Sequence, residues 1–158
     1  MTAVTITAEP DSQQVTITRD LDAPPALVFR AFTEPDLLAQ WMGPDRLTCE
    51  VTELDVRHGG HWAFVNRDVD GTEFGFRGVF HGEPSPDLMM RTFEWLGLPG
   101  HVAFETLRFE DLGGDRTRVH AESVFQTVAD RDGMIANGME VGVVEGYARL
   151  DTILAGLS

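Results

Sequence analysis

Basic residues are scarce in this sequence, and lysine is absent altogether. The 12 basic residues are all arginine and face 26 acidic ones, which gives a net charge of −14 at neutral pH. Binding to phosphate backbones or to anionic membrane surfaces needs a concentrated basic surface. A Walker-type P-loop and a Schiff base both need a lysine. We therefore expect no nucleic-acid partner, no membrane partner and neither of these lysine-dependent chemistries.

Cysteine and long apolar segments are also scarce. Cys49 is the only cysteine, so the sequence allows no intrachain disulfide and no multi-cysteine zinc site. No apolar run approaches the roughly 20 residues that span a bilayer. Residues 1–5 lack the basic and apolar regions of a secretory signal. We expect a cytoplasmic protein, monomeric or homodimeric, that uses no metal and no cofactor.

The remaining composition is that of an ordinary globular protein. Hydrophobic residues make up 42% of the 158 residues and charged residues 24%. A chain of this length suits one domain that buries roughly 70% of the surface exposed when unfolded. Residues 1–12 are polar and irregular, so we expect a flexible tail there. Residues 13–158 are expected to form the single domain.

The hydropathy pattern predicts one strand first, then two short helices, then six more strands. Residues 13–19 alternate as a strand does, and a helix is expected to start near Pro24 or Pro25, behind Asp22. A second short helix is predicted over residues 37–41. Six further strands, separated by turn signals, are predicted over residues 48–56, 61–67, 72–81, 88–96, 102–110 and 117–125. Their short connections favour an antiparallel meander.

The last segment changes to helical spacing. Apolar residues recur every three or four positions over residues 134–157, which predicts one long amphipathic helix. Gly138, Gly142 and Gly146 lie on one face of this helix, and each costs about 1 kcal/mol relative to alanine. Their spacing indicates that a sheet or a ligand packs closely there. Along the strands, aromatic residues alternate with polar ones, so one face of the sheet is expected to be apolar.

Several short segments, taken in this order, are similar to a known family. They are Phe32-Thr33, Trp41-Met42-Gly43-Pro44, Arg57-His58-Gly59-Gly60-His61-Trp62, Phe76-Arg77-Gly78-Val79, Arg91-Thr92-Phe93-Glu94-Trp95, Gly138-Met139-Glu140, Gly146-Tyr147 and Arg149-Leu150-Asp151. The set resembles the START-related helix-grip superfamily (SRPBCC), in the branch named after activators of the heat-shock-protein-90 ATPase, and fits its bacterial members. The resemblance covers residues 13–157.

This resemblance implies an α+β fold in which a curved, seven-stranded antiparallel sheet wraps around the long C-terminal helix. It also implies a cavity between sheet and helix. Relatives include lipid carriers, hormone receptors and aromatic cyclases, so the fold alone does not settle the function.

The candidate site is the space under the C-terminal helix. Its expected lining combines aromatic strand residues, one helix stripe and two polar residues: Trp62, Phe64, Phe76, Phe80, His101, Glu105, Met139, Val143 and Tyr147. Two interpretations stay open here, because the same periodicity is produced by a solid core and by an open pocket of roughly a few hundred Å³.

Polar residues in this set carry the possible chemistry. Glu105 shares its side of the strand with Leu107 and Phe109, and a carboxylate there needs a hydrogen-bond partner or a ligand. It is therefore the one weak candidate for a catalytic base, against the alternatives of an edge position or a pair with an arginine. Tyr147 and His101 could orient a ligand. The histidines show no metal-ligand spacing, and neither a serine nor Cys49 has a catalytic-triad context.

We therefore expect a protein that binds a small apolar or amphipathic molecule in the cavity, rather than an enzyme. One alternative is a cyclase- or hydrolase-type enzyme that uses the same cavity with Glu105 as its base. The other is a protein-interaction module, similar to a chaperone cofactor, which a filled cavity and an exposed apolar patch would favour.

Overall fold

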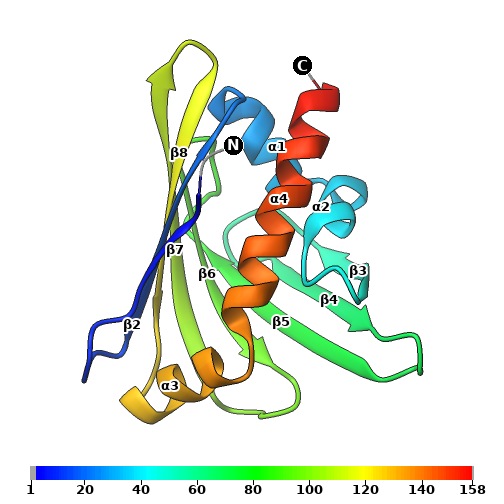
Figure 1. Cartoon of the computed structure of the whole chain (residues 1–158), viewed down its shortest axis with the longest axis vertical. Helices are drawn as coiled ribbons and strands as arrows, with labels where there is room; N and C mark the ends of the chain where they lie inside the picture. Colours follow the sequence, from blue (N-terminus) through cyan, green and yellow to red (C-terminus); the bar gives the residue numbers. More distant parts are fainter. Residues whose placement is uncertain (1–2, 158) are drawn as a thin grey trace.

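One antiparallel sheet curves around a long C-terminal helix in the computed structural model, which describes residues 3–157 (Figure 1). Within this range the sheet has eight strands: β1 (Thr5–Thr7), β2 (Gln14–Leu21), β3 (Thr48–Leu54), β4 (His61–Arg67), β5 (Glu73–His81), β6 (Leu88–Trp95), β7 (Val102–Gly113) and β8 (Arg116–Val124). The helices are α1 (Pro25–Thr33), α2 (Pro35–Trp41), α3 (Val128–Ala136) and α4 (Met139–Leu157).

Strands β3 to β8 form the predicted meander, and β2 returns to pair with β8. The order across the sheet is β1-β2-β8-β7-β6-β5-β4-β3. The α+β helix-grip fold is therefore confirmed, but the expected number of seven strands was wrong by one. The additional strand β1 lies inside the expected tail and pairs Ile6 with Ile17 of β2. Residues 1 and 2 of that tail lie outside the described residues.

The predicted C-terminal helix is interrupted near its beginning. Helix α3 starts at Val128, where the Thr127 hydroxyl accepts a hydrogen bond from the Asp130 amide at 3.0 Å. Helix α4 starts only after Gly138, whose φ of +90° is a conformation that glycine adopts without strain. The rest of the prediction holds, because Tyr147, Leu150 and Leu154 of α4 are buried in the core.

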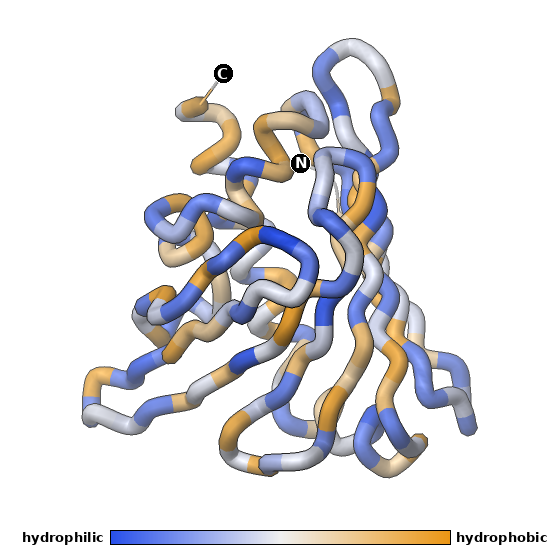
Figure 2. The backbone as a smooth tube through the Cα atoms, turned by 180° about the vertical axis from the view of Figure 1, so that it is seen from behind, coloured by the Kyte–Doolittle hydropathy of each residue, from blue (hydrophilic) through white to orange (hydrophobic). Residues whose placement is uncertain are grey.

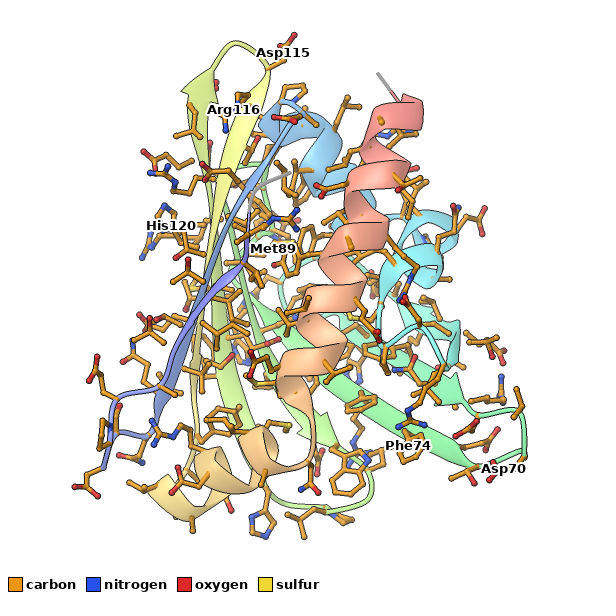
Figure 3. All side chains as sticks on the ribbon, viewed as in Figure 1. Asp70, Phe74, Met89, Asp115, Arg116 and His120 are labelled. Carbon is orange, nitrogen blue, oxygen red and sulfur yellow. The ribbon has the colours of Figure 1, made fainter. Side chains whose placement is uncertain are left out.

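The core lies between the inner face of the sheet and helices α1, α2 and α4. Apolar and polar residues alternate along the strands, as the colours in Figure 2 show. Met89 is completely buried between sheet and helix, whereas His120 points away from them on the outer face (Figure 3). The other large side chains that are fully buried are Trp62, Phe80, Leu21, Leu38, Leu150 and Leu154.

Helix α4 is also fastened to the segment that follows α2. The Cβ of a residue larger than glycine at position 146 would lie 2.9 Å from the Trp41 carbonyl oxygen. The close packing expected from the glycines is thus found at Gly146, but against this segment rather than the sheet. Arg149 donates hydrogen bonds to the carbonyl oxygens of Trp41, at 2.9 Å, and of Gly43. These bonds satisfy groups that the end of α2 leaves free.

Among the described residues, no helix has both the length and the apolar character needed to cross a membrane.

Candidate functional site

A cavity of about 490 Å³ lies between the inner face of the sheet and α4. This volume falls in the range of roughly 300–1,000 Å³ that is usual for small-molecule sites. The segment after α2 and the β6–β7 loop also contribute, through Gly43, Pro44 and Leu98. The cavity is therefore enclosed by the elements that the helix-grip architecture brings together.

The structure brings most of the sequence-predicted site residues to this cavity. Its lining includes Phe64, Phe76, His101, Glu105, Met139, Val143 and Tyr147. Trp62 and Phe80 lie outside the lining, so the expectation that they line the cavity was wrong. Phe80 is 0% exposed in the packed core. Trp62 lies behind Phe64, with the two rings stacked 5.7 Å apart.

An aromatic wall forms one side of the cavity. Phe64 stacks on Phe76 with ring centroids 5.1 Å apart, and Phe93 packs against Phe76 at 5.4 Å. Sequence reasoning missed Phe93 and Trp95, although both alternate with Thr92 and Glu94 on β6. That alternation was the available signal. Trp41 and Met134 were also left out of the predicted site, and both line the cavity.

A row of polar side chains crosses three neighbouring strands inside the cavity. Arg91 on β6 pairs in register with Glu105 on β7, which pairs with Ser123 on β8. The Arg91 Nε donates to Glu105 Oε1 at 2.9 Å, and Ser123 Oγ donates to Oε2 at 3.3 Å. The side chains of Arg91 and Glu105 are 5% and 21% exposed. Of the possibilities open for Glu105, the structure shows the pair with an arginine.

Tyr147 presents its hydroxyl from the helix side. Burial raises the pKa of this phenol far above its ordinary value, and the nearby Glu105 carboxylate adds to the rise. The hydroxyl therefore stays protonated and can donate a hydrogen bond. Within residues 3–157 it has no hydrogen-bond partner. The guanidinium of Arg19, which is paired with Asp151, lies 5.9 Å from the ring centroid.

Asn66 on β4 is a second polar group without a partner. The residue is only 4% exposed, and its Oδ1 has no hydrogen bond in the described part of the chain. It lies against Gly43, where an added Cβ would come within 2.6 Å of the Asn66 Nδ2. This oxygen has almost no accessible surface, so it does not face the open cavity, and its missing donor is an unfavourable feature of the local packing.

The mouth of the cavity carries paired charges. His101, at the start of β7, contacts Asp130 of α3, with Nδ1 and Oδ1 2.8 Å apart. Arg46 lies over the Phe74 ring at 5.8 Å and forms an ion pair with Asp68 at 2.8 Å. His101 and Arg46 are both exposed, so they mark the solvent side of the cavity.

The described residues offer little for covalent or metal chemistry. They contain no group of three or more histidine, cysteine, aspartate or glutamate residues that could hold a metal ion. Cys49 lies outside the cavity lining, and burial raises the pKa of its thiol to about 11. The Ser123 hydroxyl donates to Glu105 rather than to a histidine.

A curved sheet that grips a terminal helix around a cavity defines the START-related helix-grip class. Residues 22–155 match the model of one family in this class, described as "Activator of Hsp90 ATPase homolog 1-like protein". The chain belongs to this family.

Solved bacterial structures share the fold. A protein from Arthrobacter aurescens, solved by NMR, is 23% identical with a TM-score of 0.87, over 96% of this chain and 91% of that one. A crystal structure from Rhodobacter sphaeroides is 22% identical with a TM-score of 0.86, over 98% and 99% of the two chains. Protein Ms6760 from Mycobacterium smegmatis is 19% identical with a TM-score of 0.85, over 96% of each chain. At these identities the likeness concerns the fold alone. Among curated proteins, none matches the chain.

Proposed function

We propose that this protein binds a small apolar or amphipathic molecule in the cavity between the sheet and α4. The observation that carries this proposal is a cavity of about 490 Å³ whose wall is mainly aromatic and aliphatic. Burial of apolar ligand surface contributes roughly 25 cal/mol per Å². The unpartnered Tyr147 hydroxyl supplies a polar contact that orients a ligand. The proposal includes action in the cytoplasm, as a monomer or homodimer.

The two alternative functions have less support. A cyclase- or hydrolase-type enzyme needs a free base, but Glu105 accepts hydrogen bonds from both Arg91 and Ser123. A protein-interaction module needs a large exposed apolar patch. The outer sheet face presents one cross-strand pair of this kind, Phe104 and Val124, which are only 38% and 39% exposed. Neither observation favours these functions over ligand binding.

Replacement of Val143 by tryptophan tests the proposal. Val143 lines the cavity, whereas its neighbour Val144 is 44% exposed and lies outside the lining. An uncharged naphthalene dye, N-phenylnaphthylamine, is expected to fluoresce with wild-type protein and with Val144→Trp, but not with Val143→Trp. All three proteins should keep similar melting temperatures. The indole at position 143 fills existing space, and the indole at position 144 lies at an exposed position.

A solid core in place of the cavity would give a different result. In a solid core, a tryptophan at position 143 would overpack and cost about 1–3 kcal/mol of unfolding free energy. A wild-type protein that never binds the dye, together with a clearly destabilised Val143→Trp, would contradict the proposal.

A further inference from the structure

We propose that the ligand is an uncharged molecule with a hydrogen-bonding oxygen, and that Glu105 makes the cavity selective against carboxylates. This inference deepens the proposed function and rests on it. It follows from one contrast inside the cavity: the charge of Arg91 is already balanced by Glu105, whereas neutral hydrogen-bonding groups are free.

The charged lining residues already have polar partners. In the described part of the lining these residues are Arg46, Arg91, His101, Glu105 and Asp130. Arg91 pairs with Glu105 and Arg46 pairs with Asp68 outside the lining, while Asp130 contacts the His101 ring at the mouth. A ligand with a net charge would therefore enter a neutral, largely apolar enclosure without a counter-ion. Burial of an uncompensated charge is unfavourable by far more than burial of a neutral polar group.

Two free groups of the lining are neutral hydrogen-bond donors. The Tyr147 hydroxyl and the Trp95 indole N–H have no hydrogen-bond partner within residues 3–157, and neither does Asn66 Oδ1. A hydroxyl oxygen on a ligand can accept from Tyr147 or Trp95, whereas Asn66 Oδ1 is too deeply buried for a ligand to reach. An apolar molecule with such an oxygen satisfies these donors and leaves the charge balance unchanged.

Arg91 is the group that could bind a carboxylate, and Glu105 prevents it. Arg91 uses Nε for Glu105, while its terminal nitrogens have no acceptor in the described chain. Its guanidinium is held over the Trp62 ring at 4.5 Å. A ligand carboxylate at these nitrogens would lie beside the Glu105 carboxylate, and the like charges would repel each other in a weakly screened interior. Glu105 thus occupies the position that an acidic ligand would need.

Three probes with the same alkyl chain test the inference: decanol, decanoate and decylammonium. Their affinities can be measured from the displacement of N-phenylnaphthylamine. For the wild-type protein, we expect decanol to bind at least about tenfold tighter than either charged probe. Tyr147→Phe should weaken decanol about fivefold, because it removes one hydrogen-bond donor and keeps the ring.

Glu105→Gln should change the selectivity. With Arg91 no longer balanced, decanoate is expected to bind about tenfold tighter or more, while decanol stays within about twofold. Glu110→Gln is the matched control, since Glu110 lies on the same strand, is exposed and pairs with His120 on the outer face. It changes the net charge equally and should leave all three affinities unchanged. Melting curves report whether each variant is folded.

The possible failures can be told apart. If the dye does not bind to wild-type protein, the proposed function itself fails. If the dye binds but decanoate competes as well as decanol, or decanol does not compete, the inference is overturned and the proposed function stands. The wild-type ranking decides this even if Glu105→Gln does not fold. If that variant folds and still rejects decanoate, Glu105 is not the selective residue.

Discussion

At the scale of single residues, the aromatic wall depends on a glycine in the neighbouring strand. Trp62 of β4 crosses over Gly78 of β5 and donates from Nε1 to the Thr92 carbonyl oxygen at 3.1 Å. In the same place, the Thr92 hydroxyl accepts a hydrogen bond from the Val79 amide at 2.9 Å. Position 78 has no room for a side chain, because its Cβ would overlap both Trp62 and Thr92.

Gly78→Ala is therefore expected to destabilise the protein by about 1–3 kcal/mol or more, because the Trp62 ring must move. Denaturant unfolding followed by fluorescence measures this change. Gly156→Ala is the matched control, since nothing lies within 4 Å of an added Cβ in that part of α4. Equal stability of the two variants would show that the Trp62 contact is not as tight as described.

Sequence periodicity predicted which way a residue faces, but not how deep it lies. Trp62 and Phe64 both point to the inner face, as expected. Only Phe64 reaches the cavity, because the Trp62 indole turns toward Thr92 and stacks behind Phe64. The partner of Glu105 could not be chosen from the sequence, because it depends on the register that sets Arg91 opposite Glu105.

At the scale of elements, Arg149 connects α4 to the segment that forms part of the cavity mouth. It donates to carbonyl oxygens of Gln40, at 3.3 Å, and Trp41, at 2.9 Å, and it forms an ion pair with Asp45. Glu145, one turn earlier, accepts a hydrogen bond from the Asp45 amide at 3.0 Å. The mouth is thus held by two side chains of one helix.

Arg149→Met should reduce the unfolding free energy by about 1–3 kcal/mol, because the carbonyl groups lose a charged donor. Hydrogen exchange should speed up most in residues 40–47. Arg57→Met provides a control, because Arg57 forms an exposed ion pair with Asp55 that contributes little. Uniform exchange in Arg149→Met, with wild-type stability, would argue against this role.

The break between α3 and α4 could not be predicted from the spacing of apolar residues. The apolar stripe identified α4 correctly, but Gly138 was taken as an interior glycine. In the structure it follows α3, and that helix begins at Val128, six residues before the predicted start at Met134. The spacing of apolar residues is the same in both cases. It therefore does not distinguish a glycine inside one helix from a glycine that ends one helix before another begins.

At the scale of the whole molecule, which has a net charge of −14, many of the arginines pair with acidic residues on neighbouring elements. Asp20 of β2 accepts a hydrogen bond from Arg118 of β8 at 2.7 Å. This bond, with the nearby charges of Arg116 and His120, holds the pKa of the Asp20 carboxyl below its ordinary value of 3.8. Arg77 and the Gly100 amide lower the pKa of Glu94 in the same way.

These lowered pKa values predict acid destabilisation. A carboxyl with a lower pKa in the folded state stabilises the protein above its unfolded pKa, and this contribution is lost as the pH falls through the folded pKa. The unfolding free energy should therefore decrease below about pH 4. Asp20→Asn should be less stable at neutral pH and should lose less on acidification. Denaturant titrations across this range measure both effects, and a wild-type stability that rises below pH 4 would contradict them.

The architecture as a whole was the most predictable level. The order of elements identified the family. Each turn, and each change from strand to helix spacing of apolar residues, can be recognised within a short segment of the sequence. The eighth strand was missed because residues 5–7 form a strand only by pairing with β2. The open space under α4 depends on how aromatic rings pack across β4, β5 and β6, and no sequence pattern records that packing.

The central claim is that an uncharged apolar molecule binds between the aromatic wall and α4. An N–H correlation spectrum recorded during titration with decanol tests it directly, through the tryptophan indoles. The Trp95 indole lines the cavity without a hydrogen-bond partner in the described chain, whereas the Trp62 indole is bonded to Thr92 behind the wall. The account predicts a saturable shift of the Trp95 indole signal and little change at Trp62. A spectrum in which no cavity residue shifts, or in which the shifts lie on the outer face around His120 and Glu122, would contradict it.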